Sequence, residues 1–158
     1  MKMPESLIES AWVASAIVNG DLPWNSALRI SFEEFSKKYT LHDSTWVGVF
    51  ADVAYDNSLV LAFKWDSIWL PAGIYPPSQR VADWPILFIR ILNSSSLTLE
   101  GFSDVGGLQR GIGTASLVTD PKGKSLIIAD HYGASVVIAF HGDLEFLALD
   151  NKKAVIKI

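Results

Sequence analysis

The N-terminal residues carry apolar side chains at the spacing of an α-helix. The positions that would share one buried face are separated by one, four and four residues: Leu7, Ile8, Trp12 and Ala16. Pro4 suits the first turn, where its missing amide hydrogen has no intrahelical partner, and Gly20 offers the left-handed conformation that ends many helices. We therefore expect a first helix between Pro4 and Gly20.

A second helix is predicted directly after residue 30. Ser31 and Glu34 form a capping box, in which each side chain binds the free backbone amide of the other residue. Lys37 and Lys38 favour the negative C-terminal end of this helix. Its buried face would consist of three aromatic side chains, which we interpret as core residues: Phe32, Phe35 and Tyr39.

After residue 43 the spacing of apolar side chains changes from helical to alternating. Residues 45–55 and 59–69 are predicted to be long strands joined by a two-residue loop at Asp56 and Asn57, because both residue types tolerate positive φ angles. That loop would fix a register with an aromatic ring lying over a strand glycine. The expected pairs are Phe50 with Phe63, Gly48 with Trp65, Ala54 with Leu59, and Asp52 with Leu61.

The segment that follows contains the longest interruption of the pattern. Residues 70–85 hold four prolines and are therefore predicted to lie outside the sheet. Connections of this length are often functional. Residues 86–92 are continuously apolar apart from Arg90, which indicates a strand covered on both faces.

The C-terminal half shows short strands separated by turn sequences. The predicted turns are residues 93–96, 120–123, 132–133 and 142–143, and the predicted strands include 97–102 and 154–158. Two helices followed by such strands indicate an α+β fold with a mainly antiparallel sheet, built as a meander of hairpins. We expect residues 1–158 to form a single domain, because this length suits one hydrophobic core.

The composition excludes several classes of protein. Of the 158 residues, 49% are hydrophobic and 19% are charged, which excludes a disordered chain. The absence of cysteine excludes a disulfide scaffold, a zinc ribbon and a thiol nucleophile. A formal charge of −4 argues against a nucleic-acid partner. Neither an export signal nor a membrane-spanning apolar run is found, so we expect a cytoplasmic protein without membrane attachment.

No catalytic residue, cofactor or metal ligand is assigned from the motifs. His42-Asp43 resembles a ligand pair of metal-dependent phosphohydrolases, but such sites need further ligands on neighbouring helices, so we interpret Asp43 as a turn residue. His131 and His141 could be neighbours in adjacent strands, yet their spacing matches no ligand motif; the carboxylates close to them in sequence are Asp130 and Asp143. An enzyme that uses these histidines is the third-ranked hypothesis. The glycine-rich residues 106–113 lack the order of a phosphate-binding loop.

Charge and tryptophan are unevenly distributed along the chain. Residues 1–78 contain 9 acidic and 5 basic residues, whereas residues 79–158 contain 8 of each, so the first part carries the whole net negative charge. All six tryptophans lie before residue 85. Three have the periodic setting of core residues: Trp12, Trp46 and Trp65. Three stand beside prolines, where exposed anchors for a partner are expected: Trp24, Trp69 and Trp84.

One part of the chain resembles a known group of bacterial proteins. Residues 41–48, followed by Trp65-Asp66 and Trp69-Leu70-Pro71, are similar to the immunity proteins of contact-dependent growth inhibition systems. These small proteins accompany polymorphic toxins and share no common fold, and the resemblance covers roughly residues 40–72. It implies a cytoplasmic, non-enzymatic inhibitor that binds a cognate toxin domain, often a nuclease.

The leading hypothesis is therefore a cytoplasmic antitoxin that occludes the active site of a basic toxin domain. The expected partner-binding residues are Asp52, Asp56, Asp66, Trp69, Asp83 and Trp84. A structural role for Asp52, as a hydrogen-bonded carboxylate, is as well supported as partner binding, because the expected register places this residue on the apolar face. The alternative is a small-molecule-binding β domain whose apolar cavity is closed by residues 70–85, and homo-oligomerisation remains open.

Overall fold

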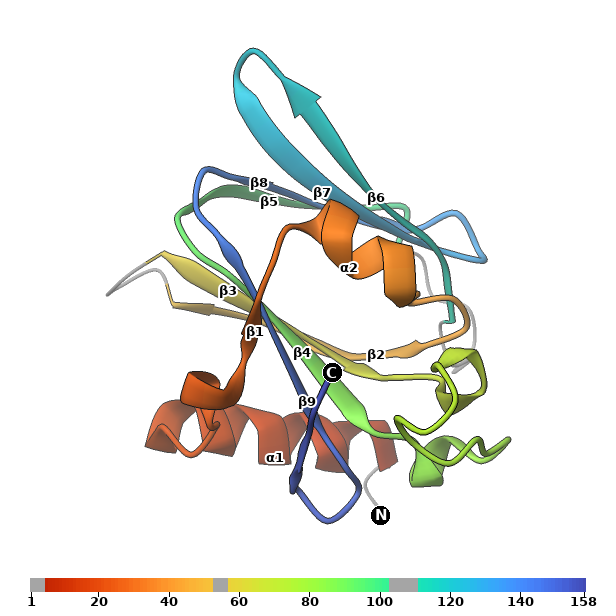
Figure 1. Ribbon diagram of the computed structural model, residues 1–158. Coiled ribbons are helices and arrows are strands. Elements are labelled where there is room, and N and C mark those ends of the chain that lie inside the picture. The colour runs from red at the N-terminus through yellow and green to blue at the C-terminus, as the bar shows by residue number, and fades with distance from the viewer. Residues whose placement is uncertain (1–4, 53–56, 103–110) are drawn as a thin grey trace.

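The computed structural model describes residues 5–52, 57–102 and 111–158, without the side chains of residues 5–8 and 52, and shows an α+β fold. A six-stranded and a four-stranded antiparallel sheet stack face to face (Figure 1). Helix α1 (Glu5–Asn19) covers the outer face of the larger sheet, and α2 (Phe32–Lys38) lies at one side between the two sheets. The predicted fold class is confirmed.

The larger sheet runs in the order β1-β9-β4-β3-β2, and β10 pairs with β9 on the same side as β1. Its strands are β1 (Leu28–Arg29), β2 (Thr45–Asp52), β3 (Ser58–Lys64), β4 (Ile86–Ile91), β9 (Leu144–Leu149) and β10 (Val155–Ile156).

The smaller sheet runs in the order β5-β8-β7-β6. Its strands are β5 (Ser94–Glu100), β6 (Ile112–Asp120), β7 (Gly123–Asp130) and β8 (Ser135–Phe140). Strands β6, β7 and β8 are joined by consecutive hairpins, as expected for a meander, whereas β5 joins the sheet on the far side of β8.

Both predicted helices are present and end as their sequences indicate. The first ends at Asn19, and Gly20 adopts a φ of 69°, the left-handed conformation predicted for it. Val13 and Ala16 pack against Phe88 of the larger sheet. The other predicted features of this helix fall outside the described side chains: Pro4, Leu7 and Ile8.

Helix α2 begins at its predicted cap and buries its aromatic face. The Ser31 hydroxyl accepts a hydrogen bond from the Glu34 amide at 3.1 Å, which confirms half of the predicted capping box. The predicted aromatic face is buried between the sheets: Phe32, Phe35 and Tyr39. Phe35 stacks on Phe146 of β9 with ring centres 4.2 Å apart. The helix therefore closes one open side of the stacked sheets.

Strand β4 is buried on both faces, as its continuous apolar sequence predicts. Ile86 and Phe88 face α1, whereas Leu87 and Ile89 belong to the core between the sheets. All four side chains have no exposed surface.

The predicted register between β2 and β3 is wrong. Phe50 pairs with Val60 and Gly48 with Ala62, and a bulge lies between Trp46 and Gly48. The ring over Gly48 is not Trp65 but Phe50 from the same strand, whose Cε2 would lie 2.9 Å from an added Cβ. Because Asp52 pairs with Ser58, five residues connect the two strands instead of the predicted two. The predicted pair of Ala54 with Leu59 lies outside the described chain, because residues 53–56 are not described.

Two of the predicted turns mark changes of sheet and not hairpins. The chain leaves the larger sheet after β4 and re-enters it before β9, so residues 92–93 and 141–143 meet at the crossings. The turn predicted at 93–96 is confined to Asn93, with a φ of 52°, and the serines join β5. At Gly142 an added Cβ would collide with the Leu92 carbonyl, which explains the glycine.

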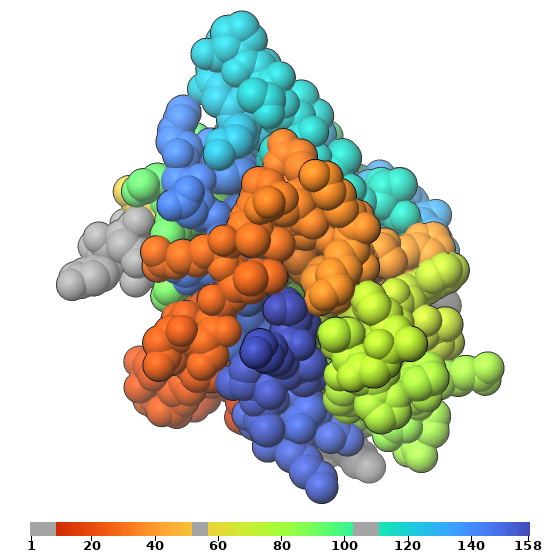
Figure 2. Space-filling model, viewed as in Figure 1, coloured from red at the N-terminus to blue at the C-terminus, as the bar shows by residue number. Residues whose placement is uncertain are grey.

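Residues 70–85 lie outside the sheets, as predicted, but the strand predicted to reach residue 69 ends at Lys64. Residues 67–85 form a compact lobe of loops with two short 3-10 helices beside α2 (Figure 2, yellow-green). These helices are η2 (Ser67–Trp69) and η3 (Val81–Asp83). The Trp84 indole donates a hydrogen bond to the Ser78 carbonyl at 2.8 Å, and the Tyr75 hydroxyl donates to the Asp83 carbonyl at 2.7 Å. Side-chain hydrogen bonds thus hold the lobe together.

Candidate functional site

Three chain segments meet at one end of the stacked sheets. The segment between α2 and β2 binds the start of β6, because the Asp43 amide donates to the Ile112 carbonyl and the Ile112 amide donates to the Ser44 carbonyl, each at 2.8 Å. The turn between β7 and β8 binds the same place, since the His131 amide donates to the Gly111 carbonyl at 3.1 Å. These bonds bring together side chains that are far apart in the sequence.

The side chains gathered there are two histidines and a carboxylate. His131 Nε2 lies 2.9 Å from Asp43 Oδ1, and His42 Nε2 lies 3.4 Å from Asp43 Oδ2. One ligand atom from each of the three residues lies within 4.8 Å of the other two. Each side chain is exposed by 41–43% of its surface, so the cluster is open to solvent. We call these three residues the His-Asp-His cluster.

Polar contacts from outside the cluster orient two of its members. His42 Nδ1 lies 3.2 Å from the Gly113 carbonyl oxygen, and the Trp69 indole donates a hydrogen bond to Asp43 Oδ2 at 3.3 Å. The Trp69 ring also meets the His42 ring edge to face, with centres 5.2 Å apart.

Backbone geometry makes room for the cluster. Asp43 has a φ of 61°, a left-handed conformation that Asp tolerates better than most residues. His131 lies against two glycines: an added Cβ would come within 3.1 Å of its ring at Gly113 and within 3.3 Å at Gly111. Gly111 and Gly113 therefore provide a close-packed support for an imidazole ring.

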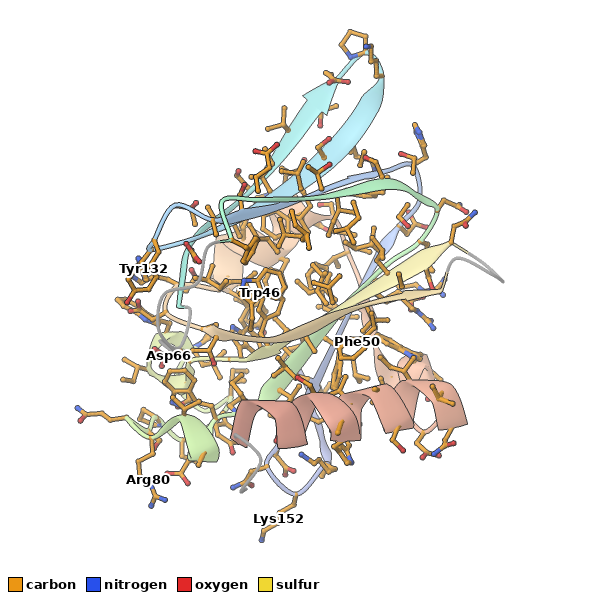
Figure 3. All side chains as sticks on the ribbon, turned by 180° about the vertical axis from the view of Figure 1, so that it is seen from behind. Trp46, Phe50, Asp66, Arg80, Tyr132 and Lys152 are labelled. Atoms are coloured by element: carbon orange, nitrogen blue, oxygen red, sulfur yellow. The ribbon has the colours of Figure 1, made fainter. Side chains whose placement is uncertain are left out.

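Exposed apolar side chains lie on the segments that carry or adjoin the cluster. Ile68 and Trp69 are 49% and 48% exposed, and Tyr132, next to His131, is 53% exposed. Phe102 is 43% exposed and follows Gly101, whose added Cβ would lie 2.9 Å from the Gly133 carbonyl oxygen. Figure 3 shows Tyr132 on the side of the molecule where Asp66, two residues before Ile68, is also found. We call the four apolar residues together with the His-Asp-His cluster the aromatic end.

The charge of this end is negative. The segments 40–46, 66–70, 111–114 and 130–134 contain neither lysine nor arginine, and Asp43 is their one partly exposed carboxylate, because Asp66 and Asp130 are buried. Asp130 is buried and accepts from the Tyr132 and Ala134 amides at 2.8 and 2.9 Å, which shapes the turn that presents Tyr132.

Asp66 is structural and does not present its charge at the surface, and its role in partner binding stays a prediction. Its side chain is only 4% exposed and accepts a hydrogen bond from the Ile68 amide at 2.9 Å, capping η2. Burial raises the pKa of this carboxyl above its ordinary value of 3.8; the hydrogen bond from Ile68 opposes this rise, and the nearby Asp43 carboxylate adds to it.

The other predicted partner-binding residues divide into three groups. Trp69 is exposed as expected, whereas Trp84 is 6% exposed and bound within the lobe, so it is not available as an anchor. Asp83 is partly exposed but engaged by the Ser78 hydroxyl at 3.0 Å and by Arg80 at 3.8 Å. The side chain of Asp52 and the whole of Asp56 lie outside what the structure describes.

The remaining tryptophans follow their predicted settings in part. Trp65 is fully buried and donates its indole N–H to the Thr40 carbonyl at 2.8 Å, and Trp46 and Trp12 are half-buried against the two cores. Trp24 is not a free anchor, because the Arg90 guanidinium lies 4.2 Å above its ring centre.

The sequence-based pairing of His131 with His141 is not found. His141 lies at the crossing from β8 to β9, packed over Gly123, whose added Cβ would lie 3.0 Å from its ring. The partner of His131 is His42, 89 positions earlier, with ring centres 5.5 Å apart. Nothing in the spacing of these residues signals the contact, since it depends on the tertiary meeting of three segments.

The small-molecule alternative has little support in the hollows that the described residues form. One of about 360 Å³ lies beside the start of α2 and includes several charged residues in its lining: Arg29, Glu33, Glu34, Lys124 and Asp143. It is bordered by α2 and the strands and not by residues 70–85.

The fold and the site define an α+β fold with an exposed aromatic end that carries the His-Asp-His cluster. Comparisons with protein-family models, with curated proteins and with solved structures give no match for this chain. Within the described residues, no helix is both long enough and apolar enough to cross a membrane.

Proposed function

We propose that this chain is a cytoplasmic immunity-type protein that binds a basic toxin domain and occludes its active site. The observation that supports this most is the aromatic end, where four partly exposed apolar side chains surround Asp43 in segments without lysine or arginine. Aromatic side chains supply most of the binding free energy in many protein interfaces. Negative charge around them attracts a basic partner and raises its association rate.

The anchor Trp69 is held in place before binding. Trp69 is held by its hydrogen bond to Asp43 and by its contact with His42, and Asp43 is held in turn by His131. A side chain that is already fixed loses less conformational entropy when a partner covers it. A nuclease cleft is electropositive because it binds phosphates, so an acidic aromatic surface can occupy it in place of the substrate.

The test is direct binding to the cognate toxin domain. The chain is co-expressed with the product of the adjacent upstream reading frame, the complex is purified, and Kd is measured for the unmodified chain and for Trp69→Ala and Tyr132→Ala. Each variant should bind more weakly by about 2 kcal/mol, roughly 30-fold in Kd. The matched control is Val18→Ala, which removes an 83% exposed apolar side chain on α1, away from the aromatic end, and should bind normally.

Charge is tested separately from the aromatic anchors. Asp43→Asn should slow association and reduce its dependence on salt, with little change in the dissociation rate. Failure of the two proteins to co-purify would contradict the inhibitory function. Co-purification with unchanged Kd for both aromatic variants would instead show that a different surface binds.

A further inference from the structure

We infer that the His-Asp-His cluster of His42, Asp43 and His131 is a binding site for one Zn²⁺ ion. This goes beyond the proposed function, because the ion would bind to the isolated chain whether or not a protein partner covers the aromatic end.

The distances within the cluster match those of a zinc site. Zn²⁺ holds nitrogen and oxygen ligands at about 2.0–2.1 Å in a tetrahedron, so neighbouring ligand atoms lie about 3.3 Å apart. His131 Nε2 lies 2.9 Å from Asp43 Oδ1 and His42 Nε2 lies 3.4 Å from Asp43 Oδ2, so each imidazole nitrogen is close to this distance from one of the two carboxylate oxygens. No pair of the three ligand atoms is further apart than 4.8 Å. Because the three side chains are partly exposed, small side-chain rotations can close the remaining gap.

The hydrogen bond of His42 presents a lone pair to the site. The Gly113 carbonyl can only accept, so the hydrogen bond at 3.2 Å requires the proton on His42 Nδ1. In neutral imidazole this leaves the lone pair of Nε2 directed toward Asp43 Oδ2, a carboxylate oxygen 3.4 Å away. In that tautomer both atoms can act as ligands of a cation placed between them. A carbonyl bound to the far nitrogen is the usual support of a metal-bound histidine.

The carboxylate has a similar support. The Trp69 indole donates a hydrogen bond to Asp43 Oδ2, which fixes the carboxylate while its other oxygen faces His131.

The ligand set favours zinc over harder cations. Two imidazoles and one carboxylate suit Zn²⁺ and related transition metals, whereas Mg²⁺ and Ca²⁺ prefer oxygen ligands alone. Three protein ligands leave one coordination position for water, and the partial exposure of the cluster gives that position access to solvent.

The competing explanation is a cluster held only by hydrogen bonds, with a proton between His131 and Asp43. Calorimetric titration of the metal-free full-length chain with Zn²⁺ separates the two. The site predicts one ion per chain and a melting temperature that rises with Zn²⁺ concentration. Co²⁺ bound in its place should give the visible absorption of a tetrahedral nitrogen and oxygen site.

Matched substitutions locate the ion. His42→Gln and His131→Gln should each weaken Zn²⁺ binding by at least about 100-fold, and Asp43→Asn, which keeps a residue type tolerant of positive φ, by at least about tenfold. The control is His141→Gln, an exposed histidine outside the cluster, which should bind Zn²⁺ as the unmodified chain does. Circular dichroism of each metal-free variant checks that it folds.

Three outcomes would overturn the site. They are absence of saturable Zn²⁺ binding to the unmodified chain, equal weakening by His141→Gln, or unchanged affinity in folded His42→Gln and His131→Gln. Because these measurements need no protein partner, they can fail while the toxin-binding proposal stands. The toxin-binding measurements can likewise fail while the metal site stands.

Discussion

Replacing Arg90 by alanine should cost far more stability than replacing Arg29, although both arginines pair with the same carboxylate. Glu145 of β9 is fully buried and lies opposite Arg90 of β4 on one side and Arg29 of β1 on the other. Arg90 Nε donates to Glu145 Oε2 at 2.7 Å, and Arg29 pairs with Oε1. The side chain of Arg90 is 24% exposed, whereas that of Arg29 is 66% exposed.

The magnitudes follow from this difference in exposure. Removing one partner of a buried ion pair costs about 3–5 kcal/mol; after Arg90→Ala the solvated Arg29 still pairs with Glu145, so we expect a loss in the lower part of that range. A largely solvated ion pair contributes about 0–1 kcal/mol, which we expect for Arg29→Ala. For a chain of this length, Tm should fall by about 6–20 °C in Arg90→Ala and by less than about 4 °C in Arg29→Ala.

Urea unfolding with an unchanged m-value measures both losses. The double variant Arg90→Leu with Glu145→Leu removes both buried charges and should recover much of the stability lost by Arg90→Ala alone. Equal losses for Arg29→Ala and Arg90→Ala would refute this reasoning, because burial would then not decide the cost.

Three further predictions concern the core, the sheet crossing and Asp66. Phe35→Ala should destabilise the fold by about 3–5 kcal/mol, because it leaves a cavity beside Phe146; unfolding by urea measures this, and a loss below about 1 kcal/mol would contradict it. Gly142→Ala should reduce the free energy of unfolding by about 1–3 kcal/mol, and so lower Tm, since the new Cβ meets the Leu92 carbonyl. An unchanged Tm would argue against the tight crossing. The raised pKa of Asp66 means that the folded state binds its proton more tightly than the unfolded chain, so its contribution to stability falls as pH rises from 3.8 to the folded pKa and is constant above it. Asp66→Asn should therefore remove that part of the pH dependence, as seen in unfolding free energies at about pH 3 and pH 7, and identical profiles for both proteins would contradict the assignment.

Features that depend on a few neighbouring residues were predictable from the sequence. Ser31 caps α2 and Gly20 ends the region of α1 because each acts on backbone groups within one helical turn. The continuous apolar sequence of β4 indicated burial on both faces, since neither face can be left in water.

Features that depend on residues far apart in the sequence were not predictable from the sequence. The register of β2 and β3 follows from a bulge and from the ring of Phe50 covering Gly48, and the sheet changes at 92–93 and 141–143 follow from a close backbone contact at Gly142. Of the six expected partner-binding residues, Trp69 and Asp83 are partly exposed, while Asp66 and Trp84 are buried because the 67–85 lobe folds back on itself.

The sequence by itself determined the α+β class, the two helices and the both-face burial of β4, because side-chain periodicity and helix caps act over short stretches of chain. Only the tertiary structure decided which strands share a sheet and which polar side chains meet. His42 and His131 come together because backbone hydrogen bonds join the α2–β2 segment, the start of β6 and the β7–β8 turn at one end of the sheets. Such a meeting depends on the packing of the whole chain, and no local spacing records it.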